Sequence, residues 1–224
     1  MIRAVIFDFD GVLANSEPLH FRAFRDVLAD NGYPLTEREY YAKYLGFDDV
    51  GAFRAIAVDQ GRPVSDALLA AMVARKAEHL ETLERDASVL FPGAREAIAR
   101  MAARGPIAIA SGALRAEILR ILDREELRHY FPVVISAEDT PASKPDPAPY
   151  RLAVSTLAAH AGVALAPREC VALEDSRWGL QSASGAGLRT IGITHSYPAG
   201  ELGEPELVIT HLDELTQDLL ARLS

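Results

Sequence analysis

Residues 4–20 read AVIFDFDGVLANSEPLH, and this stretch places two carboxylates, Asp8 and Asp10, directly after four apolar residues. A short apolar run that contains β-branched residues is typical of a strand buried on both faces of a parallel sheet. The run ends where the carboxylates begin. We therefore predict a buried first strand that carries Asp8 and Asp10 at its carboxyl end.

Five further runs of this kind follow along the chain, and helical stretches lie between most of them. The six predicted strands cover residues 3–7, 107–110, 133–136, 170–174, 189–194 and, with a weaker pattern, 206–210. The predicted helices cover residues 93–105, 114–127, 147–162 and 177–187. Strands that alternate with helices form a parallel sheet covered on both faces, joined by right-handed crossovers. The pattern predicts an α/β fold with a doubly wound, Rossmann-like parallel sheet.

Residues 16–88 interrupt this alternation, because they contain no convincing strand and look like four helices. In residues 66–83 apolar side chains recur at helical spacing, which indicates a helix face that packs into a core. We therefore predict two domains. An α-helical cap domain of residues 16–88 is inserted after the first strand, and residues 1–15 and 89–224 form the Rossmann-like core.

The composition of the 224 residues is that of an ordinary globular protein, with 49% hydrophobic and 25% charged residues. This balance excludes disordered and fibrous classes. The formal net charge of -9 and the pI of about 5.2 disfavour nucleic acid and anionic membranes as partners, although a local basic pocket can still bind phosphate. We therefore expect neither a nucleic-acid partner nor a membrane partner.

Cys170 is the only cysteine of the chain and lies in an apolar stretch, so it is expected to be a small core residue without an internal disulfide. This fits a reducing compartment. No apolar run approaches the roughly 18 residues that a membrane span requires. We expect an uncleaved, soluble cytoplasmic protein that is a monomer or a weak homodimer.

Polar residues gather at the positions where the predicted strands end. They are Asp8 with Asp10, Ser111 with Gly112, Lys144 in the segment after the third strand, and Glu174 with Asp175. Each group alone has an ordinary explanation as a turn, a helix cap or a solvated charge. Ligands of open parallel sheets bind beyond the carboxyl ends of the strands. All four groups together, in this order and each at a strand end, predict one site.

This combination of motifs resembles the haloacid dehalogenase superfamily, specifically its phosphatase and phosphomutase branch, in which a helical cap follows the first motif. The resemblance covers nearly the whole chain. It rests on the segments DFDGV, ASGA, SKPDP and LEDS, together with SEPLH and FPG beside the inserted helices.

The resemblance implies a role for each group. Asp8 would be the nucleophile that forms an aspartyl-phosphate, and Asp10 would be the general acid and base. Ser111, Gly112 and Lys144 would bind the phosphate. Mg²⁺ would be held by Asp8, by Asp10 through its backbone carbonyl, by Glu174 and by Asp175, because carboxylate oxygens suit this hard cation. Asp10 also makes a dehalogenase improbable, since dehalogenating members of the family lack an acid/base residue at this position.

The resemblance therefore implies a Mg²⁺-dependent phosphoric monoester hydrolase that acts on a small phosphorylated metabolite, either a sugar phosphate or a compound like phosphoglycolate. A phosphomutase of the β-phosphoglucomutase type is the alternative. Such mutases carry a basic residue just after the cap glycine, whereas Gly46 is followed by Asp48 and Asp49 within FDDV. Two carboxylates would repel a second phosphate, which favours hydrolysis, although Lys43 is able to replace the missing cation. A phosphate-binding module without catalytic activity is less favoured, because the set from Asp8 to Asp175 is intact.

Three residues outside the four strand-end motifs are further candidates. His20 lies on the first predicted helix of the cap and either contacts the substrate or is a solvated helix residue. Lys43 is a second candidate for contact with the substrate. Trp178 follows EDSR at a position where the family pattern usually has a small residue, and it either lines the cleft or packs.

Overall fold

The computed structural model describes residues 1–44, 47, 49–85 and 88–223. The chain divides into two compact units, which we call the sheet unit (Met1–Asn15 and Val89–Ser224) and the helical unit (Ser16–Ser88). Gly46 and Asp48, on which part of the argument about phosphomutases depends, lie outside the described residues. Among the described residues no helix is long and apolar enough to cross a membrane.

The sheet unit contains six parallel strands in the order β3-β2-β1-β4-β5-β6. The strands are β1 (Ala4–Phe7), β2 (Ile107–Ala110), β3 (Val133–Ile135), β4 (Cys170–Glu174), β5 (Arg189–Ile193) and β6 (Leu207–Ile209). All six predicted strands are present, and the doubly wound parallel sheet is confirmed. Strand order reverses on the two sides of β1, since β2 pairs with one edge of it and β4 with the other. This is the place where an open sheet binds its ligand.

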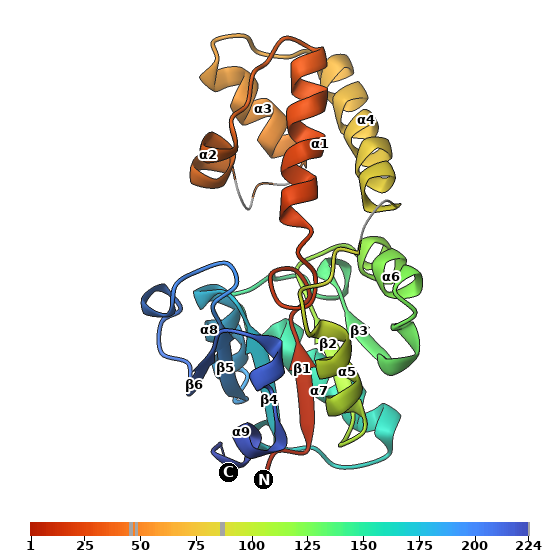
Figure 1. The fold of residues 1–224 in the computed structure, drawn as a ribbon, viewed down its shortest axis with the longest axis vertical. Coiled ribbons are helices and arrows are strands. Elements are labelled where there is room, and N and C mark those ends of the chain that lie inside the picture. Colours follow the sequence, from red (N-terminus) through yellow and green to blue (C-terminus); the bar gives the residue numbers. More distant parts are fainter. Residues whose placement is uncertain (45–46, 48, 86–87, 224) are drawn as a thin grey trace. The chain divides into compact units, whose positions relative to one another are not determined.

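Helices cover both faces of this sheet, because right-handed crossovers place the connections toward β3 and those toward β6 on opposite sides. The helices of the sheet unit are α5 (Ala94–Ala102), α6 (Arg115–Arg124), α7 (Ala148–Ala161), α8 (Arg177–Gly185) and α9 (Gln217–Ala221). Helix α7 packs on β2 and β3, and α8 packs on β4 and β5. Figure 1 shows α5 in front of the sheet and α7 behind it.

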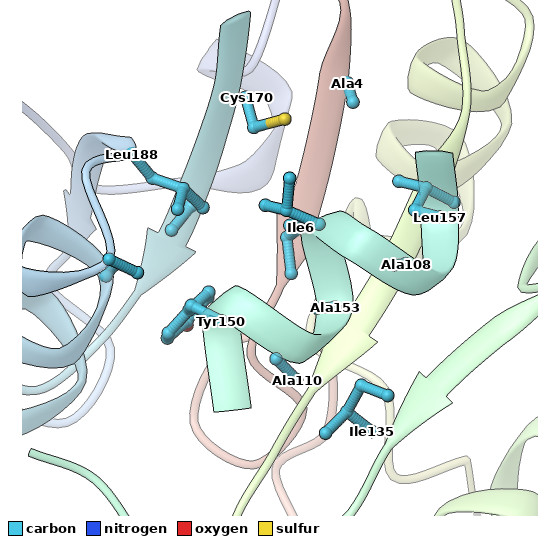
Figure 2. Packing of buried hydrophobic residues seen from close by; sticks show 14 of the residues in the cluster. Ala4, Ile6, Ala108, Ala110, Ile135, Tyr150, Ala153, Leu157, Cys170 and Leu188 are labelled. Atoms are coloured by element: carbon cyan, nitrogen blue, oxygen red, sulfur yellow. The ribbon is translucent and has the colours of Figure 1, made fainter. Parts of the chain in front are cut away.

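The core between the sheet and α7 combines alanines of the strands with larger apolar residues of both the strands and the helix. Figure 2 shows Tyr150 and Leu157 of α7 directed at the strands, where Ile6 and Ala110 lie. Alanines on the strands allow the helix to approach closely, which permits dense packing. Cys170 is completely buried in this cluster and forms no disulfide, as predicted.

The described residues of the helical unit form three long helices and one short helical segment. The elements are α1 (Glu17–Asp30), α2 (Glu37–Glu39) continued by the π-helical turn η1 (Tyr40–Tyr44), α3 (Asp49–Asp59) and α4 (Asp66–Arg85). The predicted apolar face of α4 is buried at Leu69, Met72 and Leu80. The same face also buries Lys76 and Glu84, which apolar spacing did not indicate.

Candidate active site

The position of Asp8 follows from the pairing of β1 with β4. The backbone N–H of Asp8 donates to the Leu173 carbonyl at 3.0 Å, so the sheet ladder continues one residue beyond the strand. The Oδ1 atom of Asp8 accepts a hydrogen bond of 2.7 Å from the backbone N–H of Phe9. The side chain is thereby fixed at the carboxyl edge of the sheet, and the residue is only 8% exposed.

A tight turn over residues 9–14 carries Asp10. The N–H groups of Leu13 and Ala14 both donate to the Phe9 carbonyl, at 2.8 Å and 2.9 Å. Gly11 has a φ of +76°, and a Cβ atom there would lie 1.9 Å from Oδ2 of Asp175. Glycine is therefore required both for the backbone conformation and for contact with Asp175. Asp10 is partly exposed in this turn, whereas Asp8 is buried.

Lys144 brings the first and fourth motifs together. Its Nζ atom lies 2.9 Å from Oδ1 of Asp8 and 2.6 Å from Oε1 of Glu174. The hydroxyl of Tyr150 donates to the same Oε1 atom at 2.6 Å. Burial alone would lower the pKa of Lys144, but the carboxylates of Asp8 and Glu174 outweigh it and raise this pKa above its ordinary value. Lys144 is therefore a charged member of a buried cluster and not a solvated surface residue.

The start of α8 is shaped around Glu174. Ser176 is the N-cap of this helix, and its side chain accepts from the N–H of Gly179 at 3.1 Å. A Cβ atom at Gly179 would lie 1.9 Å from Oε2 of Glu174. Only glycine lets the first turn of the helix pack against this carboxylate, so the cap and the glycine together fix the position of Glu174.

Three of the predicted metal ligands come together. Carboxylate oxygens of Asp8, Glu174 and Asp175 all lie within 4.8 Å of one another. Burial and then the negative charge of Asp8 raise the pKa values of both Glu174 and Asp175. Lys144 alone therefore does not offset all three carboxyl groups in their deprotonated form. Three hard oxygen donors with this excess of acidic groups over cations fit a divalent cation such as Mg²⁺.

Ser111 and Gly112 lie at the same edge of the sheet. The pairing of Phe7 with Ile109 places the end of β2 beside Asp8. Ser111 is buried, and its Oγ atom accepts from the N–H of Ala113 at 3.1 Å, so it also stabilises the turn. Gly112 is exposed, and no described atom lies within 4 Å of the position that its Cβ would take. The backbone at Gly112 is therefore open to a ligand.

His20 belongs to a buried polar cluster within the helical unit. Its Nδ1 atom lies 3.0 Å from Nζ of Lys76, which also binds Oδ1 of Asp49 at 2.7 Å. His20 is itself partly exposed, so neither of its two interpretations is decided by these contacts. Lys43 is exposed on η1. The assignment of His20 and Lys43 to the substrate stays a prediction.

Trp178 lines a pocket of the sheet unit and is 43% exposed. The pocket has a volume of about 480 Å³ and is also lined by Arg177, Tyr197 and Glu201. The Arg177 guanidinium lies 4.3 Å from the centre of the indole ring. Trp178 thus lines this hollow and also packs against Arg177 and Tyr197, and its assignment to the active-site cleft stays a prediction.

The motifs did not indicate four residues that the structure adds to this region, namely Tyr150, Gly179, His195 and Ser196. Tyr150 is hidden on the apolar face of a helix and carries no local signal. A glycine three residues after Ser176, which directly precedes the predicted helix of residues 177–187, is a weak signal for Gly179. His195 and Ser196 follow β5. The sequence shows that a strand ends there, but no motif marks these two residues as part of the site.

The family of the chain is shown by comparison with known proteins. Residues 5–193 match the family described as haloacid dehalogenase-like hydrolase. The phosphoglycolate phosphatase of Yersinia pseudotuberculosis is 33% identical over 221 residues, which cover 96% of this chain and 91% of that protein. Hexitol phosphatase B of Escherichia coli K12 is 33% identical over 229 residues, which cover 98% of this chain and 97% of that protein.

A solved structure extends the similarity to the whole fold. The crystal structure of a presumed β-phosphoglucomutase from Thermotoga maritima has a TM-score of 0.81 and 28% identity, and it covers 98% of this chain and 99% of that chain. The predicted enzyme class, a phosphoric monoester hydrolase, agrees with the named relatives. The chain therefore belongs to the haloacid dehalogenase-like hydrolase family, in the branch of phosphatases and β-phosphoglucomutase-like enzymes that its motifs predicted.

Proposed function

We propose that the protein is a Mg²⁺-dependent phosphatase that hydrolyses a small phosphorylated metabolite through an aspartyl-phosphate on Asp8. The observation that carries this proposal is the cluster of three carboxylates around Lys144 at the carboxyl edge of the sheet. Relatives that are phosphatases of phosphoglycolate and hexitol phosphates support it. The cytoplasmic location and the monomeric or weakly dimeric state stay predictions.

Asp8 is the group that attacks phosphorus. Lys144 and the N–H of Phe9 both bind Oδ1, which fixes the orientation of the carboxylate, and we assign Oδ2 as the attacking oxygen. The bond from this oxygen to phosphorus forms while the bond from phosphorus to the substrate oxygen breaks. Water then hydrolyses the aspartyl-phosphate and regenerates Asp8.

The attack requires compensation of charge, because both the phosphate and Asp8 are anionic. Two like charges about 4 Å apart repel by about 4 kcal/mol at an effective dielectric constant of 20. When Mg²⁺ is bound by Asp8, Glu174 and Asp175, it neutralises this repulsion and polarises the phosphoryl group. Lys144 supplies a second positive charge that the chain itself carries next to Asp8.

Asp10 performs the two proton transfers. It lies two residues after the nucleophile, in a turn where it is partly exposed. Its carboxyl group protonates the departing alkoxide and then takes a proton from the attacking water, a role that typically contributes about 10²–10⁴-fold. Ser111 and the open backbone at Gly112 hold the remaining phosphoryl oxygens.

The sequence after Gly46 favours a monophosphate as substrate. Asp48 and Asp49 follow this glycine, where the resembled phosphomutases carry a basic residue, and two carboxylates would repel a second phosphate. Within the helical unit, Asp49 is paired with Lys76 at 2.7 Å. We therefore place hydrolysis of a sugar phosphate or a phosphoglycolate-like compound ahead of a phosphomutase reaction, which remains the alternative.

The test of the proposal is Asp8→Asn, a nearly isosteric change that removes the nucleophile. With Mg²⁺ and p-nitrophenyl phosphate we expect kcat to fall by at least about 10³-fold, as is typical when an enzyme loses its nucleophile. Circular dichroism and the melting temperature check that the variant is folded. Asp123→Asn, at an exposed aspartate of α6, is the matched control and should keep its activity.

The same measurements separate the alternatives. A phosphatase releases inorganic phosphate from phosphoglycolate, hexitol phosphates or hexose phosphates and is inactive in EDTA. A phosphomutase interconverts isomeric sugar phosphates with little release. If the protein binds phosphate but turns over none of these compounds, it is a phosphate-binding module and not an enzyme. If Asp8→Asn retains more than about a tenth of wild-type kcat, the proposed mechanism is wrong.

A further inference from the structure

The loop that follows β5 touches two parts of the candidate site. It begins with Thr194, whose N–H donates to the carbonyl of Ile209 at 3.1 Å, so the loop is anchored to β6. His195 and Ser196 come next. Neither residue belongs to the four motifs, and both contact groups that these motifs supply.

His195 holds the turn that carries Asp10. Its Nδ1 atom lies 3.0 Å from the carbonyl oxygen of Gly11, and because a carbonyl only accepts, Nδ1 is the donor. The imidazole stacks on Phe91 with 3.8 Å between ring centroids and 20° between planes. The N–H of Phe91 in turn donates to the Leu13 carbonyl at 3.0 Å. The turn is therefore held on two sides.

Ser196 holds the carboxylate of Asp175. Its side chain forms a hydrogen bond with that carboxylate, which favours the charged form of Asp175. A Cβ atom at Gly11 would lie 1.9 Å from Oδ2 of Asp175 and 2.8 Å from Oγ of Ser196. The serine hydroxyl, the carboxylate and the glycine of the turn thus meet at one point.

We propose that His195 and Ser196 are positioning residues, which place the Asp10 turn and orient Asp175 toward the metal. This inference rests on the proposed function. Hydrogen bonds behind metal ligands fix their direction, and loss of such a partner typically costs about 10–100-fold in metal affinity or activity. The two residues have separate roles. Ser196 orients Asp175, a ligand of the metal, and His195 holds the turn that carries Asp10, the general acid and base.

Ser196→Ala tests the orientation of Asp175. We expect Mg²⁺ affinity, measured by calorimetry without substrate, to fall by about 10-fold or more. At saturating Mg²⁺ kcat should stay within about threefold of wild type, because the ligand itself remains. Ser155→Ala is the control, since that hydroxyl donates to the Leu152 carbonyl on an exposed position of α7. An affinity within twofold of wild type would overturn the role of Ser196.

Two substitutions of His195 separate its hydrogen bond from its stacking. His195→Asn keeps a side-chain N–H close to the place of Nδ1, whereas His195→Phe keeps a ring on Phe91 and removes the donor. We expect the phenylalanine variant to lose about 10-fold in kcat with little change in KM, and the asparagine variant to remain within about threefold of wild type. A phenylalanine variant as active as the asparagine variant would overturn the role of His195.

Hydrogen exchange gives a readout that needs no turnover. The N–H of Gly11 donates to the Ala14 carbonyl at 2.9 Å, so its exchange reports the integrity of the turn. Exchange at Gly11 and Ala14 should be faster in His195→Phe than in His195→Asn, and equal rates contradict the inference. If the wild-type protein hydrolyses no phosphate ester, the proposed function fails, while calorimetry and exchange still decide the positioning roles.

Discussion

Two lysines, one in each unit, are buried and ion-paired, but their surroundings carry different charge. Lys76 of the helical unit is 1% exposed and binds Asp49 at 2.7 Å and His20 at 3.0 Å. Lys144 of the sheet unit has a side chain that is 12% exposed, and it binds Asp8 at 2.9 Å and Glu174 at 2.6 Å. Both lysines are shielded from solvent and ion-paired, so these two properties alone do not distinguish Lys144 from Lys76.

The charges around Lys76 nearly cancel. Asp49 supplies one negative charge. Glu17 is another carboxyl near this lysine, and burial raises its pKa in spite of the hydrogen bond from Tyr40 and the charge of Lys76. Glu17 is therefore closer to neutrality than an exposed glutamate, and one cation faces about one anion.

Around Lys144 three carboxyl groups face one ammonium group. Burial and the charge of Asp8 raise the pKa values of Glu174 and Asp175, so the metal-free protein limits the surplus of negative charge only by holding protons. A buried charge that lacks a partner is costly, and a protein keeps such an arrangement where a ligand completes it. The comparison teaches that surplus charge, more than a buried ion pair, marks the place where a ligand binds.

The largest effect is expected for Lys144→Ala. Removal of the ammonium group leaves the repulsion between Asp8 and a phosphate less compensated, so kcat/KM should fall by about 10²–10³-fold, as for other groups that stabilise charge in the transition state. Steady-state kinetics with saturating Mg²⁺ measure the loss.

Lys43→Ala is the matched control for this variant, because Lys43 is exposed in the helical unit. We expect an unchanged kcat. A rise of KM alone would assign Lys43 to substrate binding. If Lys144→Ala is as active as wild type, the charge surplus at the sheet edge has no catalytic meaning.

A smaller effect, on stability, is expected for Lys76→Met. The change leaves Asp49 without its partner, and the free energy of unfolding should fall by about 2–3 kcal/mol. This is less than the roughly 3–5 kcal/mol of a fully buried pair, since the Asp49 side chain is 33% exposed. Denaturant unfolding measures the change.

The double variant Lys76→Met with Asp49→Leu sharpens this comparison. Replacing both partners by apolar residues removes the unpaired charge, so most of the lost stability should return. A double variant that is less stable than Lys76→Met would show that the pair is not the balanced structural unit described above.

The smallest effect is a dependence of stability on pH in the metal-free protein. Burial, followed by the charge of Asp8, raises the pKa of Glu174 to about 8. A carboxyl with a raised pKa binds its proton more tightly in the folded state, so its contribution to stability is lost as pH rises through that value. The melting temperature should fall between pH 7 and 8.5 by at least about 2 °C, the shift that 1 kcal/mol produces in a protein of this size.

Glu174→Gln should abolish this dependence, and Mg²⁺ should raise the melting temperature of the wild type more at pH 8.5 than at pH 7, because it binds the deprotonated carboxylates. A melting temperature of the metal-free protein that rises over this range would contradict the charge surplus at Glu174.

The sequence alone determined the order of the strands along the chain and the site they present. Short apolar runs have the period and length of buried strands, and polar residues at their ends must meet at one edge when the strands are parallel. For this reason the sequence predicts that Asp8, Ser111, Lys144 and Glu174 share one site. The long helical insertion was visible because it breaks the alternation of strands and helices.

Only the tertiary structure decided which side chains support that site. Tyr150 donates to Glu174 from the apolar face of α7, and His195 reaches the turn at Gly11 across 184 residues of sequence. Lys76 lies on the apolar face of α4 yet pairs with Asp49 of another helix. Such contacts depend on how helices and loops pack in space, which local periodicity and short motifs do not encode. A hydrogen bond or an ion pair acts over about 3 Å, and only the fold brings its distant partners within that range.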